Sequence, residues 1–285
     1  MNNMNCKIAL GTVQFGLNYG ITNSKGITPE VEVKQILDYY YSEGGRVIDT
    51  SMAYGVSEKV IGEYHNNRFK IITKLSWEHV DNLENYLSLS LSKLKVSKVY
   101  ALMLNTADIL NENPSIWSEM QKIKNSGKCN KIGFSLYTTR QLEILLDKNI
   151  IPDIVQLPMS VADRRFVPFL KRLKELGTEV HVRSVFLQGI LLLTPSKLDK
   201  NFKELFPLLT KIRETVSNDL LPGYLGKVIV DIKEVDYVVL GVNDVSQLKD
   251  NFSSMRKIKK TNINEFDEYE ISKKVVLPHL WGIKK

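Results

Sequence analysis

The chain has 285 residues, of which 43% are hydrophobic and 25% are charged, and its formal net charge is +7. This composition excludes a fibrous or low-complexity chain and allows one large globular domain or two ordinary ones. The lysines are spread along the whole chain and are not interleaved with aromatic residues, so the positive charge favours a small anionic ligand over nucleic acid.

No apolar run approaches the roughly 20 residues that a membrane span needs, and the first residues lack the pattern of a secretion signal. We therefore expect a cytoplasmic protein without a membrane partner. The two cysteines, Cys6 and Cys129, are too few for a disulfide framework, and they have no metal-ligand spacing with the four histidines. We expect both to be buried reduced thiols, and we predict no metal site.

Short apolar runs alternate with segments of helical period about eight times along the chain. The runs cover residues 7–11, 46–50, 69–75, 98–104, 130–135, 153–158, 179–184 and 236–242. Between the first two, Pro29 suits a first helical turn, and Gly44 with Gly45 suits a helix stop. Residues 80–96 and 163–177 repeat this pattern before later runs. Strands this rich in Val, Ile and Leu, separated by helices, predict a parallel sheet covered on both faces.

Eight strand and helix units in a chain of this length predict an α/β fold, a closed (β/α)8 TIM barrel, in preference to an open doubly wound sheet. The sequence also lacks the glycine-rich GxGxxG turn of the open dinucleotide-binding fold. No linker, low-complexity tract or shift in composition divides the chain. We therefore predict a single domain over residues 1–285.

Polar residues stand where the predicted strands end. In a barrel the loops after the strands form the functional face, so these side chains are expected to converge there. Each has an ordinary interpretation on its own, because a strand-end aspartate is often a helix cap and a loop tyrosine is often half-buried. The strand-end residues of the second to seventh strands are Asp49, Lys74, Asn105, Ser135, Gln156 and Arg183, and Tyr54 follows the second strand.

An acid, a phenol and an amine at this spacing suit proton transfer. A neighbouring ammonium stabilises tyrosinate and so lowers the pKa of a tyrosine, and a carboxylate keeps that ammonium charged. Asp49, Tyr54 and Lys74 provide these three groups. We expect Lys74 to lower the pKa of Tyr54.

Several segments of the chain resemble the aldo/keto reductase superfamily. The specific one is IDTSMAYGVSEKVIG at residues 48–62, followed at the family's distance by Lys74. Weaker matches extend the resemblance from Lys7 to about Phe252: LGTVQFG, GFS, VQLP, RSVFLQGILL and GVNDVSQLKDN. The resemblance implies a barrel that binds NAD(P)H in an extended conformation and reduces a carbonyl compound by direct hydride transfer. It places Asp49, Tyr54 and Lys74 on three members of the catalytic tetrad, with Tyr54 as the general acid.

The fourth member departs from the family, which usually has a histidine at the end of the fourth strand. This chain has Asn105 there, in ALMLNTADIL. An asparagine can still donate a hydrogen bond to a substrate carbonyl, but it cannot titrate. His79, in a loop on the same face, is a candidate to compensate, although an ordinary exposed loop histidine is the default interpretation.

The resemblance also implies a cofactor site. Gly11 and Thr12 would lie beside the nicotinamide ribose, Ser135 and Gln156 would bind the carboxamide, and Arg183 takes the place of an aromatic residue stacked on the nicotinamide. It favours NADP(H) over NAD(H), although no arginine or lysine holds the usual 2'-phosphate positions near the last strand. The loop over the diphosphate would contribute Ser184, Phe186, Gln188 and Gly189. The end of the last strand and the next helix, with free N–H groups for a phosphate, would contribute Gly241, Val242, Asn243, Gln247 and Asn251.

The substrate is encoded less clearly. The family's C-terminal tail, here residues 260–285, folds over the active-site mouth, and the candidate pocket walls are Phe15, Tyr19, Trp77, His279 and Trp281. We expect a small-molecule carbonyl substrate, with a keto-sugar or nucleotide sugar favoured because the RSVFLQG variant resembles reductases of surface-polysaccharide and sugar metabolism. Two alternatives stay open. The missing histidine favours an NADP(H)-binding regulatory or interaction protein with little turnover, and the Tyr54 and Lys74 pair also suits a sugar epimerase or lyase.

Overall fold

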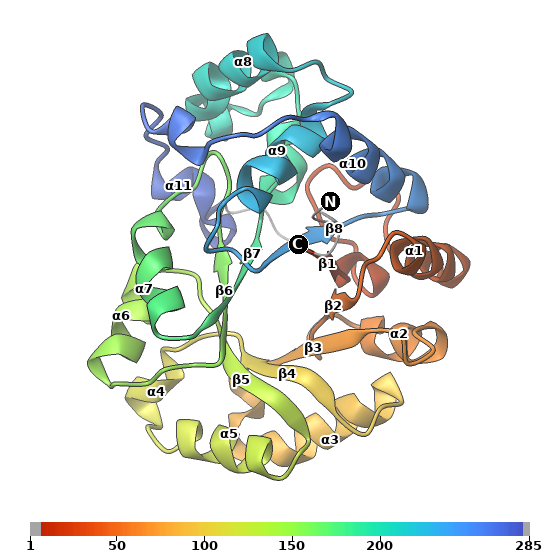
Figure 1. Cartoon of the computed structure of the whole chain (residues 1–285), viewed down its shortest axis with the longest axis vertical. Coiled ribbons are helices and arrows are strands. Elements are labelled where there is room, and N and C mark those ends of the chain that lie inside the picture. The colour runs from red at the N-terminus through yellow and green to blue at the C-terminus, as the bar shows by residue number, and fades with distance from the viewer. Residues whose placement is uncertain (1–6, 282–285) are drawn as a thin grey trace.

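The computed structural model of the chain describes residues 7–281 and contains a closed barrel of eight parallel strands (Figure 1). Each strand pairs with the next one along the chain, and β1 pairs with β8 to close the barrel. The predicted (β/α)8 barrel is confirmed, and each strand lies within its predicted run to within one residue. The strands are β1 Ile8–Gly11, β2 Val47–Asp49, β3 Lys70–Leu75, β4 Val99–Leu104, β5 Cys129–Ser135, β6 Ile154–Pro158, β7 Glu179–Arg183 and β8 Tyr237–Gly241.

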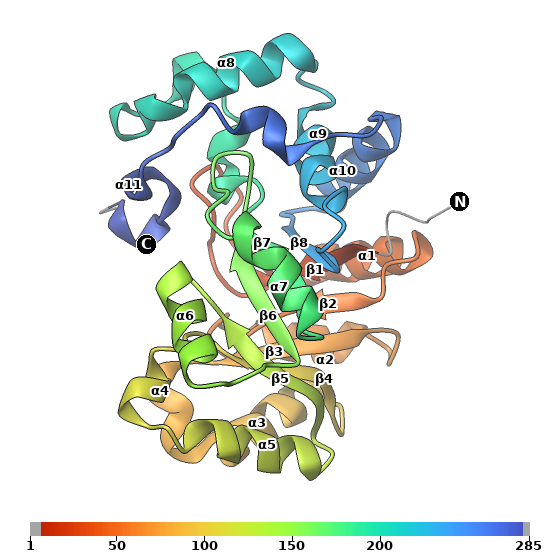
Figure 2. The same cartoon turned by 60° about the vertical axis from the view of Figure 1, so that its left-hand side comes forward.

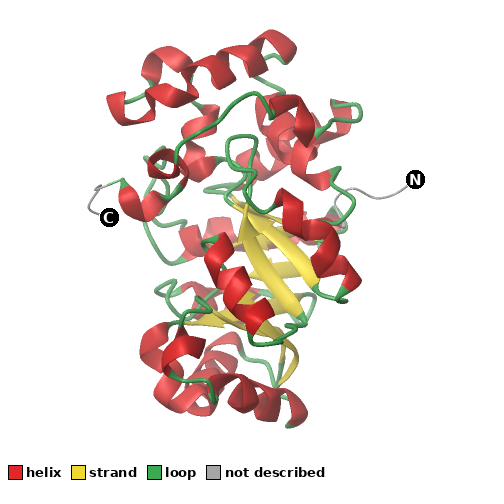
Figure 3. Ribbon diagram, turned by 90° about the vertical axis from the view of Figure 1, so that its left-hand side faces the viewer, coloured by secondary structure: helices red, strands yellow, loops and turns green. Residues whose placement is uncertain are grey.

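Helices surround the strands as an outer layer (Figure 3). The first of them shows why these segments are helical: it begins directly after Pro29, carries two acidic residues in its first turn, and buries apolar residues at helical spacing. The helices are α1 Glu30–Ser42, α2 Ser57–Tyr64, α3 Leu83–Leu94, α4 Ile109–Glu112, α5 Ile116–Asn125, α6 Thr139–Asp147, α7 Leu170–Glu175, α8 Phe206–Thr215, α9 Leu221–Val230, α10 Val245–Lys257 and α11 Lys273–Val276. No helix in residues 7–281 is long and apolar enough to cross a membrane.

The barrel interior is divided into layers. A polar cluster fills the end where the strands begin: the Glu179 carboxylate accepts hydrogen bonds from Tyr100 (2.7 Å) and Lys131 (2.5 Å), and it contacts His181 Nε2 at 2.7 Å. A small apolar layer lies in the middle, made by Ala9, Val47, Ile72, Ala101, Met103 and Ile154. The opposite end, where the strands finish, carries the candidate site.

The segment after β7 and the C-terminal tail lie together outside the barrel. Helix α8 forms the outermost layer beyond α9 and α10, and the tail passes beside it on the way to α11 (Figure 2). Two hydrogen bonds join Ser272 in the tail to Glu204, which precedes α8. Cys129 is buried at the start of β5, and Cys6 lies outside the described residues.

Candidate active site

The carboxyl ends of the eight strands bring most of the predicted site residues together. Strand register places Gly11 beside both Asp49 and Gly241, and Ser135 beside Gln156. Each strand contributes one residue to this ring, within its last three positions or directly after it: Gly11, Asp49, Lys74, Asn105, Ser135, Gln156, Arg183 and Gly241. The barrel geometry therefore does what the sequence predicts, since residues spread over 230 positions of the sequence meet at one face.

The centre of the ring is a buried ion pair. Lys74 Nζ lies 2.8 Å and 2.7 Å from the two carboxylate oxygens of Asp49, and it also donates to the Thr50 carbonyl oxygen at 2.8 Å. The side chains of Lys74 and Asp49 are only 2% and 4% exposed. Burial lowers the pKa of Lys74, and the Asp49 carboxylate opposes that change. This buried ion pair is tolerated because each of the two charges has a partner.

Tyr54 lies above this pair, in the loop after β2, with Lys74 Nζ 5.4 Å from the centre of its ring. Two glycines let this loop pack on the turn after β1. A Cβ on Gly16 would lie 1.8 Å from the Tyr54 carbonyl oxygen, and Gly55, at φ +55°, would place its own Cβ 2.4 Å from the Gly16 carbonyl oxygen. The Ser57 hydroxyl adds a second connection, lying 3.0 Å from the Thr12 carbonyl oxygen.

The pKa of Tyr54 is raised above its ordinary value in this structure. Burial raises it, and the negative charge of Asp49 raises it further, whereas Arg183 lowers it. Lys74, tightly paired with Asp49, is not among the causes of this shift, and the expected lowering of the Tyr54 pKa by Lys74 stays a prediction. Tyr54 is thus held as a neutral proton donor.

Asn105 directly follows β4, and its Nδ2 donates to the Ser76 hydroxyl at 3.2 Å. His79 does not contact Asn105. Its Nδ1 accepts the Ser76 backbone N–H at 3.0 Å, and its ring packs on Tyr86 with centroids 4.4 Å apart. The structure therefore gives His79 the role of a helix cap, so it is not the exposed loop residue that was the default interpretation, and a compensating catalytic role stays a prediction.

The residues expected around a nicotinamide are mostly engaged with one another. Gln156 Nε2 donates to Asp49 Oδ1 at 2.7 Å, and the Thr12 hydroxyl donates to the Asp49 carbonyl oxygen at 3.0 Å. Ser135 is 3% exposed at the end of β5. The guanidinium of Arg183 lies over the Tyr137 ring at 4.4 Å and donates to the Leu136 carbonyl oxygen at 3.0 Å.

The loop after β7 has an unusual backbone. Ser184, Leu187 and Gln188 all have positive φ, at 67°, 47° and 54°, although none is glycine. Gly189 follows with φ +93°, and a Cβ there would meet the Thr22 hydroxyl at 2.0 Å. Phe186 lies within this turn and packs against the core. Such strained turns persist at functional sites where surrounding structure fixes them, which fits the expected diphosphate loop.

The start of α10 differs from the prediction of free N–H groups. Glu32 accepts the Val245 N–H at 2.6 Å, Asp244 accepts the Gln247 N–H at 2.8 Å, and Gln247 Oε1 accepts the Asn243 N–H at 2.9 Å. These N–H groups are not free for a phosphate, because side chains of the same protein cap them. Val242 and Asn251 are both buried, at 2% and 6% exposed.

Buried polar atoms without hydrogen-bond partners lie on three of the loops where the resemblance expects a dinucleotide. Among the described residues, Gln14 Oε1, Gln188 Nε2 and Asn243 Oδ1 are buried without a hydrogen bond. They stand on the loops after β1, β7 and β8, where the resemblance places the cofactor. A Cβ on Gly241 would meet Gln14 Oε1 at 2.7 Å, so the Gln14 side chain packs directly on this point of the rim. Buried polar groups without partners are costly, and a polar ligand would satisfy them.

The candidate substrate residues separate into three groups. Phe15 is fully buried in the core, so it supports the loop after β1 and does not offer a pocket wall. Trp77, 41% exposed, and the partly buried Tyr19 belong to loops at the mouth. His279 is exposed in the tail, and Trp281 packs edge-on against Phe202 at 5.1 Å, outside the barrel.

The match to known families agrees with this geometry. The model of the aldo/keto reductase family covers residues 7–271 of the chain. The chain belongs to the aldo/keto reductase family. Members of this family are oxidoreductases that use a nicotinamide cofactor and act on small-molecule carbonyl compounds.

Solved structures of other aldo/keto reductases share the fold. The holo form of the aldo-keto reductase AKR11C1 from Bacillus halodurans has a TM-score of 0.74 and 18% sequence identity, with 95% of each chain covered. Its apo form has a TM-score of 0.68 and 20% identity, covering 87% of this chain and 91% of that one. No protein with a curated description matches the sequence. Identities this low show a common fold and leave the substrate open.

The structure adds residues to this aldo/keto reductase mouth that sequence reasoning missed. The loop after β6 carries Asp163, 5% exposed, whose Oδ2 lies 3.0 Å from Arg165 Nη2. Arg164, by contrast, points to the tail and donates to the Tyr269 carbonyl oxygen at 2.9 Å. The signal was the DRR triplet that follows β6, which was assigned to the start of a helical segment.

Burial of Asp163 predicts a pH dependence of stability. Burial raises its pKa from 3.8 to about 6, although Arg165 opposes the shift. Between these values the native state holds more protons than the unfolded state, so the free energy of unfolding falls as pH rises through this window. From pH 4.5 to 7 we expect a loss of about 2 kcal/mol from this group. Denaturant titrations of wild type and Asp163→Asn at both pH values measure it, and identical pH slopes would contradict the assignment.

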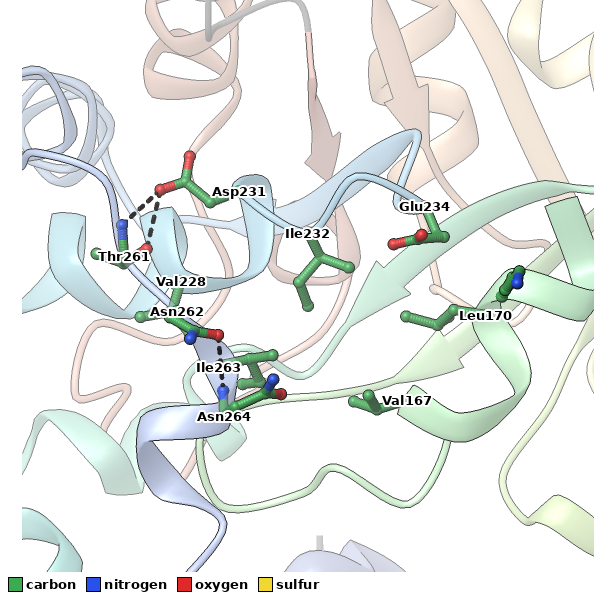
Figure 4. A pocket seen from close by; sticks show the side chains of 11 residues that line it. Val167, Leu170, Val228, Asp231, Ile232, Glu234, Thr261, Asn262, Ile263 and Asn264 are labelled. Atoms are coloured by element: carbon green, nitrogen blue, oxygen red, sulfur yellow. Dashed lines mark hydrogen bonds between the residues drawn. The ribbon is translucent and has the colours of Figure 1, made fainter.

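A separate depression lies away from the mouth, between α7, the end of α9 and the tail (Figure 4). Its polar rim is internally paired: Asp231 accepts hydrogen bonds from the backbone and hydroxyl of Thr261, and Asn262 accepts one from the Asn264 N–H. Part of its wall, Ile232 and Glu234, directly precedes β8 and so belongs to the end of the barrel opposite the mouth. We assign no chemistry to it.

Proposed function

We propose that this aldo/keto reductase reduces a carbonyl compound to an alcohol, with Tyr54 as the proton donor. The observation that carries the proposal is the buried pair of Lys74 and Asp49 directly beneath the Tyr54 ring. Burying an ion pair costs desolvation free energy, so such a pair is expected where it serves a function. Beside a phenol that must lose and regain a proton, that function is proton transfer.

Each residue of the mouth has its own role in the proposed reduction. The nicotinamide, when bound, supplies a hydride to the carbonyl carbon. Tyr54 holds the proton at its hydroxyl, since burial keeps the phenol neutral, and gives it to the carbonyl oxygen. Lys74, which Asp49 keeps charged, lies close enough to stabilise the tyrosinate that remains. Asn105 aligns the carbonyl, because its amide has two N–H donors and only one of them is used by the Ser76 hydroxyl.

The decisive experiment follows the absorbance of NADPH and of NADH with a panel of aldehydes, ketones and keto-sugars. Carbonyl-dependent oxidation of either cofactor supports the proposal. Bound cofactor without turnover on any carbonyl would favour the regulatory binding protein, and product without net oxidation would favour the epimerase or lyase.

Replacement of Asn105 by histidine tests the fourth catalytic position. A histidine can hold and relay a proton as well as orient the carbonyl, so we expect kcat/KM for simple aldehydes to rise by about tenfold or more. Asn111→His, at an exposed position of α4, is the matched control and should change nothing. An unchanged rate in Asn105→His would mean that this position does not limit general carbonyl reduction.

The finer assignments rest on resemblance. It favours NADP(H) over NAD(H), a sugar or nucleotide sugar as substrate, and a cytoplasmic location, and each of these stays a prediction. Lys25 allows a test of the cofactor preference, because its exposed ammonium lies 2.6 Å from Asp244 at the start of α10. If it binds a 2'-phosphate, Lys25→Met should weaken NADPH binding and leave NADH binding unchanged, as measured by nucleotide fluorescence.

A further inference from the structure

The mouth carries more positive charge than its carboxylates balance. Lys74 is paired with Asp49, and Arg165 is paired with Asp163. Arg183 forms no ion pair with a carboxylate among residues 7–281, and its hydrogen bonds go to the neutral oxygens of Leu136 and Ser184. Two carboxylates therefore face three cations at the ends of β2, β3, β6 and β7.

Arg165 also has unused hydrogen-bonding capacity. Its side chain is 17% exposed, yet Nε and Nη2 have no hydrogen-bond partner in the part of the chain that the structure describes, even though Nη2 lies close to Asp163. Buried guanidinium N–H groups are normally satisfied, and an orphaned pair of them is expensive. An Nε and an Nη atom together form the edge of the guanidinium that binds two oxygens of one oxyanion.

Arg165 and Arg183 act electrostatically on a common titratable group of the mouth. Arg165 and Arg183 both influence the pKa of Asp163, and the charge of Arg183 is among the causes that lower the pKa of Arg165. Arg183 also acts on the pKa values of Tyr19 and Tyr54. Strand register pairs Arg183 with Pro158, and the loop that follows Pro158 carries Arg165, so the two arginines come from neighbouring strand ends, with Arg183 acting on Tyr54. Like charges held together in a largely buried site favour an anion between them.

We propose that Arg165 and Arg183 bind an oxyanion of the substrate, a carboxylate or a phosphate attached to the carbonyl compound that Tyr54 protonates. This inference rests on the proposed function only in that it calls the bound molecule a substrate. The prediction that an oxyanion binds rests on the two arginines alone. Arg165 provides the Nε and Nη2 edge for bidentate binding, and Arg183 provides the uncompensated positive charge. Asp163 holds Arg165 in place when no ligand is bound, and it competes with the ligand for the guanidinium.

Anion binding is measured first, on the full chain with and without NADH, by calorimetric titration of inorganic phosphate and of acetate, with chloride as the reference. We expect one oxyanion to bind at least about tenfold more tightly than chloride, and Arg165→Met to remove that advantage. Lys171→Met removes the same charge from an 84% exposed side chain and should leave it intact.

Three outcomes of this titration overturn the proposal. The first is equal affinity for all three anions, and the second is an equal effect of the two substitutions. The third is an oxyanion that binds only without NADH, because this assigns the arginines to the cofactor. A carboxylate and a phosphate are distinguished by which of the two probes binds.

Asp163→Asn gives an independent test, which also covers the possibility that Arg165→Met does not fold. It keeps the shape of the side chain but releases the guanidinium from its carboxylate. We expect oxyanion affinity to rise several-fold, a gain that a damaged structure would not produce. Unchanged or weaker affinity in a folded Asp163→Asn variant contradicts the competition between Asp163 and the ligand.

Turnover then separates this inference from the proposed function. Succinic semialdehyde is compared with butanal, and glyceraldehyde 3-phosphate with glyceraldehyde, because each pair differs in its charged group. We expect the charged member to have the higher kcat/KM in one pair, and Arg165→Met to reduce that preference about tenfold while changing the uncharged member little. Turnover without any charge preference overturns the inference. If no carbonyl compound oxidises the cofactor, the proposed function fails and the anion titrations still decide the role of the arginines.

Discussion

Replacement of Tyr54 by phenylalanine is expected to lower kcat for carbonyl reduction by about 10²–10⁴-fold, because it removes the phenol that lies over the Lys74 and Asp49 pair. The aromatic ring and its packing stay, so cofactor binding should change little. Steady-state kinetics with the best carbonyl substrate and a fluorescence titration of the nucleotide measure the two effects separately.

Tyr64→Phe is the matched control, since it removes a phenol whose hydroxyl contacts Glu30 at 3.3 Å on the surface of α2. It should leave kcat unchanged. A Tyr54→Phe variant that retains kcat within a few-fold of wild type would remove Tyr54 from the mechanism. If cofactor affinity falls as much as kcat, the loop after β2 has been damaged and the comparison with Tyr64→Phe shows it.

Replacement of Lys74 by methionine is expected to lower both turnover and stability. Asp49 would be left as a buried carboxylate, and breaking a buried pair in this way costs about 3–5 kcal/mol. Turnover should fall because nothing is left to stabilise the tyrosinate. Denaturant unfolding measures the first effect, and kinetics on the folded fraction measures the second.

Two further variants serve as controls for the loss of stability in Lys74→Met. Lys34→Met breaks an exposed pair with Asp38, whose side chains are 59% and 42% exposed, and should cost about 1 kcal/mol or less. The double variant with Lys74→Met and Asp49→Asn removes both buried charges and should recover much of the lost stability without recovering turnover. A Lys74→Met variant as stable as Lys34→Met would contradict the buried, desolvated pair.

The barrel was predictable because its strands are buried on both faces. Their runs of Val, Ile and Leu stand out from the amphipathic helices between them, and β3 and β7 fall within the predicted runs. Polar residues at the strand ends were equally visible, since parallel strands all finish at one face. The pairing of Lys74 with Asp49 follows from strand register, which adjacent strands fix.

The loops were less predictable, because their contacts join residues far apart in the sequence. Glu32 caps the start of α10 from a position 213 residues earlier, and no local pattern announces it. Gln156 reaches Asp49 across the barrel in the same way. The pKa of Tyr54 depends on its burial and on the charge of Asp49, which is a matter of distances. Arg165 and Asp163 were overlooked because a loop and a helix start have similar local composition.

The contact between Gly16 and Gly55 has a consequence for how this protein can diversify. Two backbone turns touch there without space for a methyl group, so the turn after β1 and the Tyr54 turn must move as one rigid piece. An insertion or a bulkier residue in either turn would shift the tyrosine along with it. We therefore expect variation in ligand choice in the loops after β4 and β6, which can change length or charge while the proton donor keeps its place.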